Sequence, residues 1–187
     1  MNKPQSAPAL VLIRYGLRAM GAADLTVVHG WLNEPHVTRG WPNPEGALRT
    51  LTRRLSAPGI ACCILTIDRR DAGNLQVYDP HHALPPAADE PTSGHPYRDQ
   101  PRGTGGIDPF MGGARVIGRC GSRLIRRVIE YLLKAEIPCV ATDPDPTHQR
   151  SLAALRRAGL CCIRQRDTAW RHVRLMGCVN LKPTVSP

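Results

Sequence analysis

The stretch Gly106-Ile-Asp-Pro-Phe-Met-Gly-Gly-Ala-Arg-Val-Ile-Gly-Arg-Cys-Gly-Ser-Arg-Leu124 decides the fold of this chain. It begins as an extended segment, passes through a glycine-spaced loop and ends in the first turn of a predicted helix. Backbone N–H groups at a helix N-terminus bind anions, and glycines let a phosphate come close to them. Arg115, Arg119 and Arg123 would add bidentate donors. The same pattern fits a plain helix cap beside solvated arginines, so the residues leave both interpretations open.

The residues around and after this stretch predict a βαβα unit. Apolar residues recur at helical spacing from Leu124 to Leu132, and Gly159 stands where a glycine ends many helices. The predicted elements are a strand at 105–110, a helix at 122–134, a strand at 139–142, a helix at 147–158, and closing strands at 160–166 and 172–179. We expect the strands at 105–110 and 139–142 to be parallel neighbours joined by the helix between them.

The N-terminal half predicts two helices followed by a hairpin. Leu25, Val28 and Leu32 form one helical stripe, and a second stripe ends at Leu55. The predicted elements are a strand at 10–18, helices at 22–32 and 45–55, a strand at 60–67, a turn at 71–74 and a strand at 75–78. The whole chain therefore reads as an α/β fold with a mixed, mostly antiparallel sheet of six or seven strands and helices on both faces.

Length and composition set the domain organisation. A chain of 187 residues suits one domain. We expect a flexible leader at 1–9, a single domain at 10–180 containing a proline-rich loop at 79–103, and a tail at 181–187. No apolar run of 18 residues and no signal sequence are readable, which predicts a cytoplasmic protein without membrane contact. Seven cysteines, two adjacent pairs among them and no C-x-x-C, predict reduced, mostly buried thiols and no metal site.

Charge is unevenly distributed. The formal net charge is +10, yet Asp79 to Asp108 holds five acids and two arginines, a net −3 that leaves +13 for the remainder. Basic surfaces attract nucleic acids or anionic cofactors. Aromatic residues make up 4% of the chain and do not alternate with the basic runs, so we expect no nucleic-acid partner.

Two blocks resemble the GCN5-related N-acetyltransferases, and most closely the aminoglycoside 6'-N-acetyltransferases. These blocks are the Gly106-Ile-Asp strand with its loop and helix, and Thr142-Asp-Pro-Asp-Pro-Thr-His-Gln-Arg-Ser-Leu-Ala-Ala-Leu-Arg-Arg-Ala-Gly-Leu160. The resemblance extends loosely from Leu17 to Val179. It implies the fold of that family, acetyl-CoA as cosubstrate, acetylation of a primary amine on a small cationic molecule, and a role in antibiotic resistance.

The resemblance also implies site residues. Asp108 matches the family's catalytic aspartate, which relays a proton from the attacking amine. Strand N–H groups near Asp108 to Phe110 would polarise the thioester oxygen. Cofactor-binding positions are Ile107, Phe110, Arg115, Ile117, Gly118, Arg119, Cys120, Gly121, Ser122 and His148. Substrate-binding positions are Tyr78, Asp108 and Asp143, to which the negative charge of the 79–108 segment adds Asp79 and Asp99.

The residues alone allow blander roles as well. Asp108 precedes Pro109 and could simply form a turn, and the same holds for Asp143. The chain departs from the family at Leu155, where the family has a tyrosine, at His148, where it has an asparagine, and in the loop, whose second glycine comes one residue late.

Two alternative functions stay open at this stage. Trp31-Leu-Asn-Glu-Pro-His36 resembles acylases of hydroxylysine in siderophore biosynthesis, and the departures would also fit a non-catalytic acyl-CoA-binding protein. The expected partners are a small-molecule amine and at most a second copy of the chain, since the protein is predicted to be a monomer or a homodimer.

Overall fold

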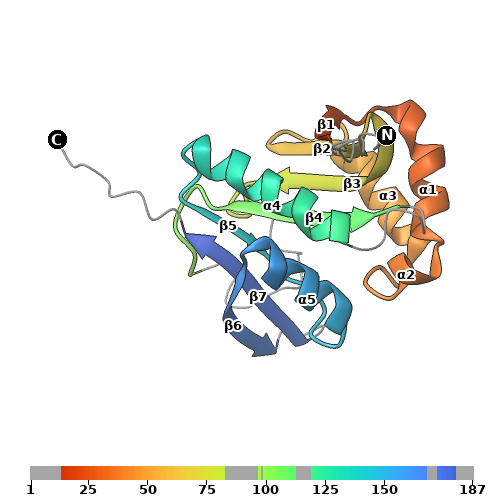
Figure 1. The fold of residues 1–187 in the computed structure, drawn as a ribbon. Helices are drawn as coiled ribbons and strands as arrows, with labels where there is room; N and C mark the ends of the chain where they lie inside the picture. The colour runs from red at the N-terminus through yellow and green to blue at the C-terminus, as the bar shows by residue number, and fades with distance from the viewer. Residues whose placement is uncertain (1–13, 83–96, 98, 113–118, 168–171, 180–187) are drawn as a thin grey trace, which may run out of the picture.

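The protein folds into an α/β domain built on one seven-stranded sheet (Figure 1). The computed structural model describes residues 14–82, 97, 99–112, 119–167 and 172–179. The strand order is β1-β2-β3-β4-β5-β7-β6. The strands are β1 (Tyr15–Ala19), β2 (Ile60–Ile67), β3 (Arg70–Tyr78), β4 (Gly105–Met111), β5 (Cys139–Thr142), β6 (Cys161–Asp167) and β7 (His172–Val179). The predicted mixed, mostly antiparallel sheet is confirmed.

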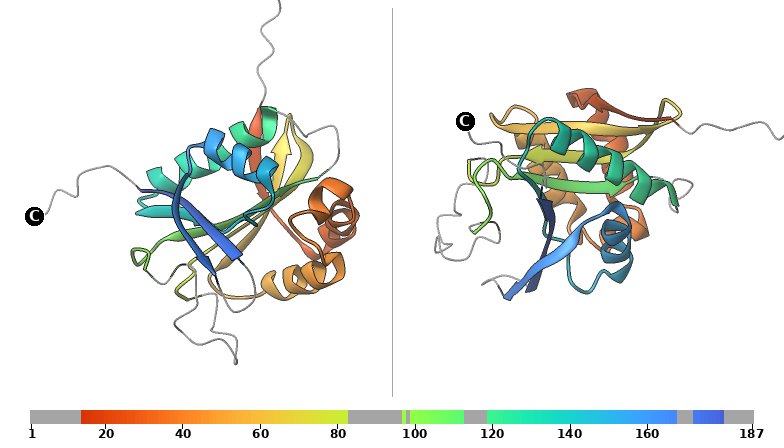
Figure 2. Two further views of the ribbon diagram at one scale, coloured as in Figure 1. Left: turned by 90° about the horizontal axis from the view of Figure 1, so that it is seen from below. Right: turned by 60° about the vertical axis from the view of Figure 1, so that its left-hand side comes forward.

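Helices cover both faces of the sheet, as predicted. Their bounds are η1 (Ala22–Asp24), α1 (Leu25–Leu32), α2 (Pro35–Thr38), α3 (Pro44–Arg54), α4 (Arg119–Lys134) and α5 (Gln149–Ala158). Figure 2 shows α4 and α5 on one side of the sheet and α1 to α3 on the other. The chain therefore forms three layers, with the strands in the middle.

The parallel pair β4 and β5 is the centre of the fold and is also its shortest pairing. Only Gly105 and Gly106 pair with β5, opposite Val140 and Ala141. β4 continues for five more residues, to Met111, without β5 beside it. The backbone edge of β4 that faces away from β3 is thus left without a strand partner beyond Gly106.

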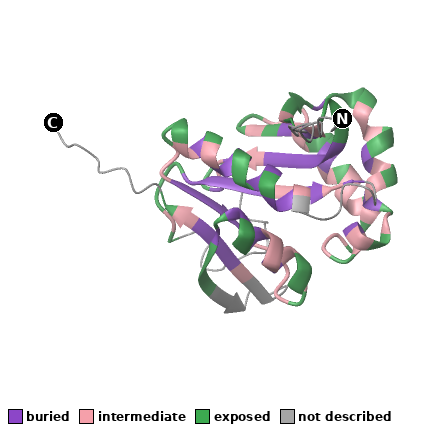
Figure 3. Ribbon diagram, in the orientation of Figure 1, coloured by how far each residue is buried: buried purple, intermediate pink, exposed green. Residues whose placement is uncertain are grey.

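Two apolar clusters hold the layers together. The larger one packs α4 and α5 against the face of the sheet that carries Leu75 and Ile107. The smaller one packs α1 to α3 against the opposite face, around Ile64 and Phe110. Figure 3 shows the central strands buried and the outer helix surfaces exposed. Since successive strand residues point to opposite faces, Asp108 lies on the same face as Phe110, toward α1 to α3.

The turn between β2 and β3 differs from the prediction. Residues 71–74 were expected to turn, but they belong to β3, and the chain reverses at Asp68 and Arg69. Both residues have a positive φ, 49° and 64°. Two successive left-handed residues match the right-handed twist of a hairpin, and aspartate adopts this conformation more readily than most residues. The Asp68 carboxylate also accepts a hydrogen bond from the Arg14 N–H at 2.9 Å.

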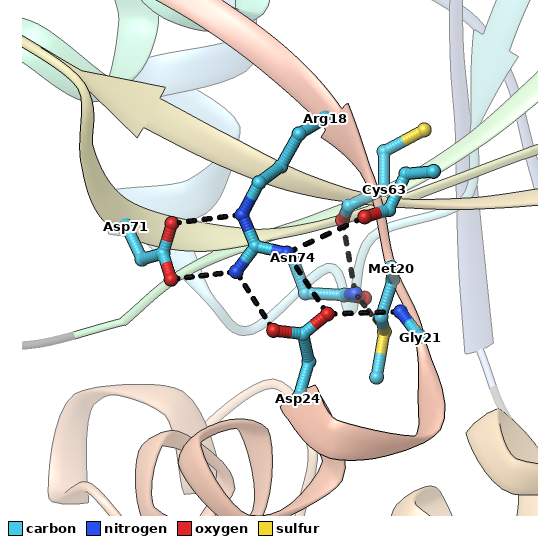
Figure 4. A network of polar contacts seen from close by, with 8 residues as sticks. Arg18, Met20, Gly21, Asp24, Cys63, Asp71 and Asn74 are labelled. Carbon is cyan, nitrogen blue, oxygen red and sulfur yellow. Dashed lines mark hydrogen bonds and ion pairs between the residues drawn. The ribbon is translucent and has the colours of Figure 1, made fainter.

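An ion-pair network fastens the first strand to the rest of the sheet (Figure 4). Arg18 of β1 donates to Asp24 in η1 at 2.7 Å and to Asp71 in β3 at 2.6 Å. The hydrogen bond from Arg18, followed by that from the Gly21 N–H, lowers the pKa of Asp24. Beside this network Asn74 is buried, and its amide donates to the Cys63 carbonyl oxygen at 3.1 Å.

The cysteines are reduced but less buried than expected. All seven thiols are free. Cys62 and Cys139 are buried, whereas Cys161 and Cys162 are exposed because β6 is an edge strand of the sheet. Among the described residues, no group of three or more His, Cys, Asp or Glu side chains is placed to hold a metal ion. Within the same ranges, no helix is long and apolar enough to span a membrane.

Candidate active site

Asp108 lies in the middle of β4 and is half-buried, with 18% of its side chain exposed. Its two carboxylate oxygens have different partners. Oδ1 accepts a hydrogen bond from the Tyr78 hydroxyl at 3.1 Å, and Oδ2 accepts one from Arg54 Nη1 at 3.2 Å. The aspartate is therefore not a turn residue before Pro109. It is a strand residue whose carboxylate is held by side chains from two other elements.

Tyr78 reaches Asp108 because Gly106 has no side chain. Tyr78 of β3 pairs with Gly106 of β4, and the Tyr78 ring covers Gly106. A Cβ on Gly106 would lie only 2.4 Å from Cε2 of Tyr78. The glycine of the Gly106-Ile-Asp block is thus required for close approach of an aromatic ring.

Arg54, at the last turn of α3, brings a positive charge to the site. Its Nη1 also donates to Gln76 Oε1 at 2.5 Å, and its guanidinium carbon lies 5.4 Å from the centre of the Tyr78 ring. Gln76 is fully buried, and its Nε2 has no hydrogen-bond partner within the described ranges. Arg54 and Gln76 therefore fix Asp108 on one side and leave a buried amide donor beside it.

Tyr97 links this group to a second carboxylate. Its ring packs edge-on against Tyr78 with 6.4 Å between centroids, and its hydroxyl lies 3.5 Å from that of Tyr78. The Tyr97 hydroxyl donates to Asp143 Oδ1 at 3.0 Å. Burial, then the negative charge of Asp143, raises the pKa of Tyr97. Burial, then the charge of Asp108, raises the pKa of Tyr78. Both phenols therefore stay protonated and act as donors.

Two other predicted substrate residues lie outside this group. Asp79 accepts hydrogen bonds from the His81 N–H and from His82 Nδ1, both at 2.8 Å. Partial burial opposes ionisation of Asp79, yet these contacts lower its pKa overall. Asp99 forms an ion pair with Arg164 of the edge strand β6, and both side chains are nearly half exposed. The structure therefore joins Tyr78, Asp108 and Asp143 but not Asp79 or Asp99.

The predicted cofactor residues fall into three groups. Ile107 and Phe110 are core residues on opposite faces of β4. Arg115, Ile117 and Gly118 lie outside the described residues. Arg119 to Ser122 form the first turn of α4, which contains no acidic residue and whose Ser122 is buried. A helix end of this composition suits an anion.

The backbone edge of β4 fixes which amides face away from β3. Gly112 donates its N–H to the Ala72 carbonyl, so by strand alternation the N–H groups of Asp108 and Phe110 are directed toward β3. Pro109, which has no N–H, occupies a position whose N–H would face away from β3. The N–H groups on the other edge belong to Gly105, Ile107 and Met111. The Met111 carbonyl accepts a hydrogen bond from His36 Nε2 at 3.0 Å.

His148 and Leu155 take different places on α5. His148 precedes the helix and lies close to Gly40, where an added Cβ would be 3.1 Å from Nδ1. Burial lowers the pKa of His148, which keeps the ring neutral at pH 7. Leu155 is buried in the core under α4. The position where the family has a tyrosine thus holds a packing residue.

Sequence reasoning missed three residues of the site: Arg54, Gln76 and Tyr97. Gln76 stands two residues before Tyr78 in a strand, so the shared face was readable from alternation. Arg54 is distant in sequence and belongs to a helix end, and Tyr97 lies within the proline-rich segment 79–103. No local pattern signals either of these two contacts.

Comparisons with known proteins bear on the family and the fold of this chain. A family model described as an acetyltransferase (GNAT) domain matches residues 21–168. Two curated relatives, the aminoglycoside N(6')-acetyltransferases type 1 of Klebsiella pneumoniae and Serratia marcescens, are 25% identical over 152 residues, which covers 76% of this chain and 72% of theirs.

Solved structures show the same fold. The aminoglycoside acetyltransferase AAC(6')-Ib in complex with coenzyme A and kanamycin superposes with a TM-score of 0.71 at 23% identity, over 89% of this chain and 95% of that one. An aminoglycoside N(6')acetyltransferase from Legionella pneumophila superposes with a TM-score of 0.66 at 16% identity, over 92% and 96% of the two chains.

Proposed function

Since the chain belongs to the GNAT family of acetyltransferases, we propose that it acetylates a primary amine of a small cationic molecule, the 6'-amine of an aminoglycoside. The observation that carries this proposal is the Asp108 carboxylate, held in the middle of β4 by Tyr78 and Arg54 beside the unpaired edge of that strand. The curated relatives, which are named for this activity, support the substrate class.

Asp108 would act as the proton acceptor. An amine is an ammonium ion at neutral pH and cannot attack a thioester until it loses a proton. The side chain of Asp108 is 18% exposed, so its carboxylate can contact the substrate amine while Tyr78 and Arg54 hold it in position. Tyr78 and Arg54 stabilise the carboxylate as an anion before the proton arrives, and Gln76 keeps Arg54 in place.

The residues present suit acetyl-CoA, the acyl donor of the family. Acetyl-CoA supplies the activated acetyl thioester and carries negative phosphates. The first turn of α4 lies at the N-terminal end of a 16-residue helix and carries no acidic side chain, which suits a diphosphate. The edge of β4 beyond Gly106 offers the Met111 N–H as a backbone donor that β3 does not use.

The charge of the site sets the kind of amine. Asp108 and Asp143 provide two carboxylates, and Arg54 offsets one of them. A substrate ammonium has to compete with the guanidinium for Asp108. We therefore expect activity on a narrow set of aminoglycosides rather than on all of them.

Arg54 also favours one alternative. A guanidinium beside the acceptor carboxylate could bind the α-carboxylate of an amino acid, as acylation of a hydroxylysine-type amine requires. The acceptor would then be a zwitterion rather than a polycation, and catalysis at Asp108 would follow the same proton transfer.

A panel assay separates these functions. Release of CoA thiol from acetyl-CoA is measured with neomycin, with paromomycin, which carries a hydroxyl in place of the 6'-amine, and with N6-hydroxylysine. Turnover of neomycin but not of paromomycin supports 6'-N-acetylation. Turnover of hydroxylysine alone supports the alternative, and no thiol release with any amine, in a protein that binds acetyl-CoA, overturns both.

A further inference from the structure

Two buried phenols connect the two carboxylates of the site. Tyr78 donates to Asp108 at 3.1 Å, Tyr97 donates to Asp143 at 3.0 Å, and the two hydroxyl oxygens are 3.5 Å apart. Tyr78 is 4% exposed and Tyr97 is 1% exposed. The four side chains thus form one continuous line of oxygens through the interior.

This line crosses the place where the sheet opens. Asp108 lies on β4 and Asp143 directly follows β5, two strands that are paired only as far as Gly106. Strand pairing therefore cannot couple the ends of the line. The two tyrosine side chains couple them instead, together with the ring-to-ring packing that fixes their orientation.

We propose that Tyr97 and Asp143 are positioning residues that act through Tyr78 on Asp108, and that the line carries the acceptor's proton from Asp108 to Asp143. This inference rests on the proposed role of Asp108 as the proton acceptor. Arg54, which contacts Asp108 from α3, and Gln76, which contacts Arg54, do not form part of the line.

The proton transfer balances in three short moves. Once the amine's proton is on Asp108 Oδ1, the Tyr78 hydroxyl can no longer donate to that oxygen and turns to donate to the Tyr97 oxygen, so that Asp108 becomes the donor to Tyr78. The proton on Asp108 then passes to the Tyr78 oxygen while the Tyr78 proton passes to the Tyr97 oxygen. The Tyr97 proton then passes to Asp143 Oδ1. Asp108 returns to a carboxylate, both phenols stay neutral throughout, and Asp143 holds one proton that it can release, since it is not fully buried.

The first test needs no substrate. Aspartate is labelled with 13C at the carboxyl carbon, and the signals of Asp108 and Asp143 are assigned with D108N and D143N. In the wild type the Asp108 signal is expected to follow the titration of Asp143 as well as its own. In Tyr97→Phe, which keeps the ring and removes the hydroxyl, this second step is expected to vanish. The proposal is overturned if the Asp108 signal of the wild type does not shift when Asp143 titrates. It is also overturned if the Asp108 signal shifts with the titration of Asp143 as much in Y97F as in the wild type.

The second test uses any amine that the wild type acetylates. We expect Y97F to lower kcat about tenfold and to leave the acceptor KM within about twofold, as loss of a proton path does. The double variant Y97F/D143N should have a kcat no lower than that of the less active of the two single variants, because both changes break the same line. The dependence of kcat on the deuterium fraction of the solvent should be curved in the wild type and linear in Y97F.

Tyr131→Phe is the matched control. Tyr131 lies on α4 with 66% exposure, so the same chemical change there should leave kcat and the solvent isotope effect unchanged. If Y97F has the kcat and the solvent isotope effect of the wild type, the proposed proton transfer through Tyr97 is wrong, while the proposed acetylation is unaffected. Conversely, if Asp108 and Asp143 titrate together but the protein acetylates no aminoglycoside, the proposed substrate is wrong and the proposed proton line is retained.

Discussion

At the scale of single residues, the site depends on the absence of a side chain at Gly106 as much as on the carboxylate of Asp108. The glycine makes room for the ring of Tyr78, and the ring brings the hydroxyl to the carboxylate. The family resemblance singled out Gly106-Ile-Asp as a motif, and the close approach gives a physical reason for its first residue.

Gly106→Ala tests this reason. The added Cβ would lie 2.4 Å from the Tyr78 ring, so the ring has to move and its hydroxyl has to leave Asp108. We expect kcat to fall about tenfold, to the level of Tyr78→Phe, with a loss of about 1–3 kcal/mol in stability. Gly30→Ala on α1, where a Cβ meets nothing within 4 Å, should keep full activity and gain about 0.5–1 kcal/mol. Wild-type kcat and Tm in G106A would contradict the account.

Asp108→Asn tests the proton acceptor. The amide keeps the size of the side chain and cannot take a proton from the ammonium. Turnover should fall by roughly two to four decades, while calorimetric affinity for acetyl-CoA stays within about twofold. A variant that acetylates a protonated amine at the wild-type rate would remove Asp108 from the mechanism.

At the scale of elements, the first turn of α4 is the candidate phosphate site. A Cβ at Gly121 would lie 3.4 Å from Cγ of Met111, an unbranched side chain that can shift, so larger residues fit here at small cost. Gly121→Glu places a negative charge at the helix N-terminus, and Gly121→Gln places the same bulk without charge. We expect the glutamate to weaken acetyl-CoA binding by about 2 kcal/mol more than the glutamine does, measured by calorimetry. Equal affinities of the two variants would argue against a phosphate at this turn.

The Arg18 network is an element-scale device that ties β1 and η1 to β3. Arg18→Gln removes both ion pairs and should cost about 1 kcal/mol of stability at pH 7, a modest value because Arg18 is 41% exposed. The pKa of Asp24 is lowered in the folded protein, so this stabilisation is complete above the ordinary carboxyl pKa of about 3.9 and is lost as the pH falls further. Urea unfolding of wild type and R18Q should therefore converge in acid. Arg53→Gln, an exposed arginine on α3 with one weak contact to Thr50, is the control. A pH-independent difference between wild type and R18Q would show that Asp24 is not the cause.

At the scale of the whole molecule, the uneven charge distribution suits two partners of opposite charge. The segment from Asp79 to Asp108 has a net charge of −3 within a chain of +10, and the remainder suits an anionic cosubstrate. However, Asp79 pairs with His82 and Asp99 with Arg164, away from the group around Tyr78. The carboxylates that we propose to meet a cationic substrate are therefore Asp108 and Asp143.

Salt dependence measures this attraction. Charges are screened beyond about 8 Å at physiological ionic strength, so raising the salt should increase the KM for an aminoglycoside several-fold while kcat changes little. Asp99→Asn should change this KM less than Asp143→Asn does, because Asp99 pairs with Arg164 instead of joining the site. An equal effect of the two substitutions would place the substrate near the edge strand β6 instead.

The sequence by itself determined most elements and their order. Apolar periodicity located β2, α3, β4 and β5 to within a few residues, and Gly159 ends α5 in the left-handed conformation with φ 107°. These features are local, since side-chain spacing and glycine φ act over one or two turns of chain. The block around Asp108 was also readable, because a strand, loop and helix follow one another without interruption. The hairpin turn was misplaced because aspartate occurs at both candidate positions and only the register of β2 and β3 distinguishes them.

Tertiary structure alone decided how the site is composed. Arg54 contacts Asp108 across 54 residues of sequence, and Tyr97 contacts Asp143 across 46. Such contacts depend on helix packing and on the early end of the β4–β5 pairing, which no local pattern encodes. Packing also separates Asp79 and Asp99 from Asp108, since Asp79 pairs with His82 and Asp99 pairs with Arg164. Composition fixed the charge of the segment, and packing fixed which carboxylates lie together around Tyr78 and Tyr97.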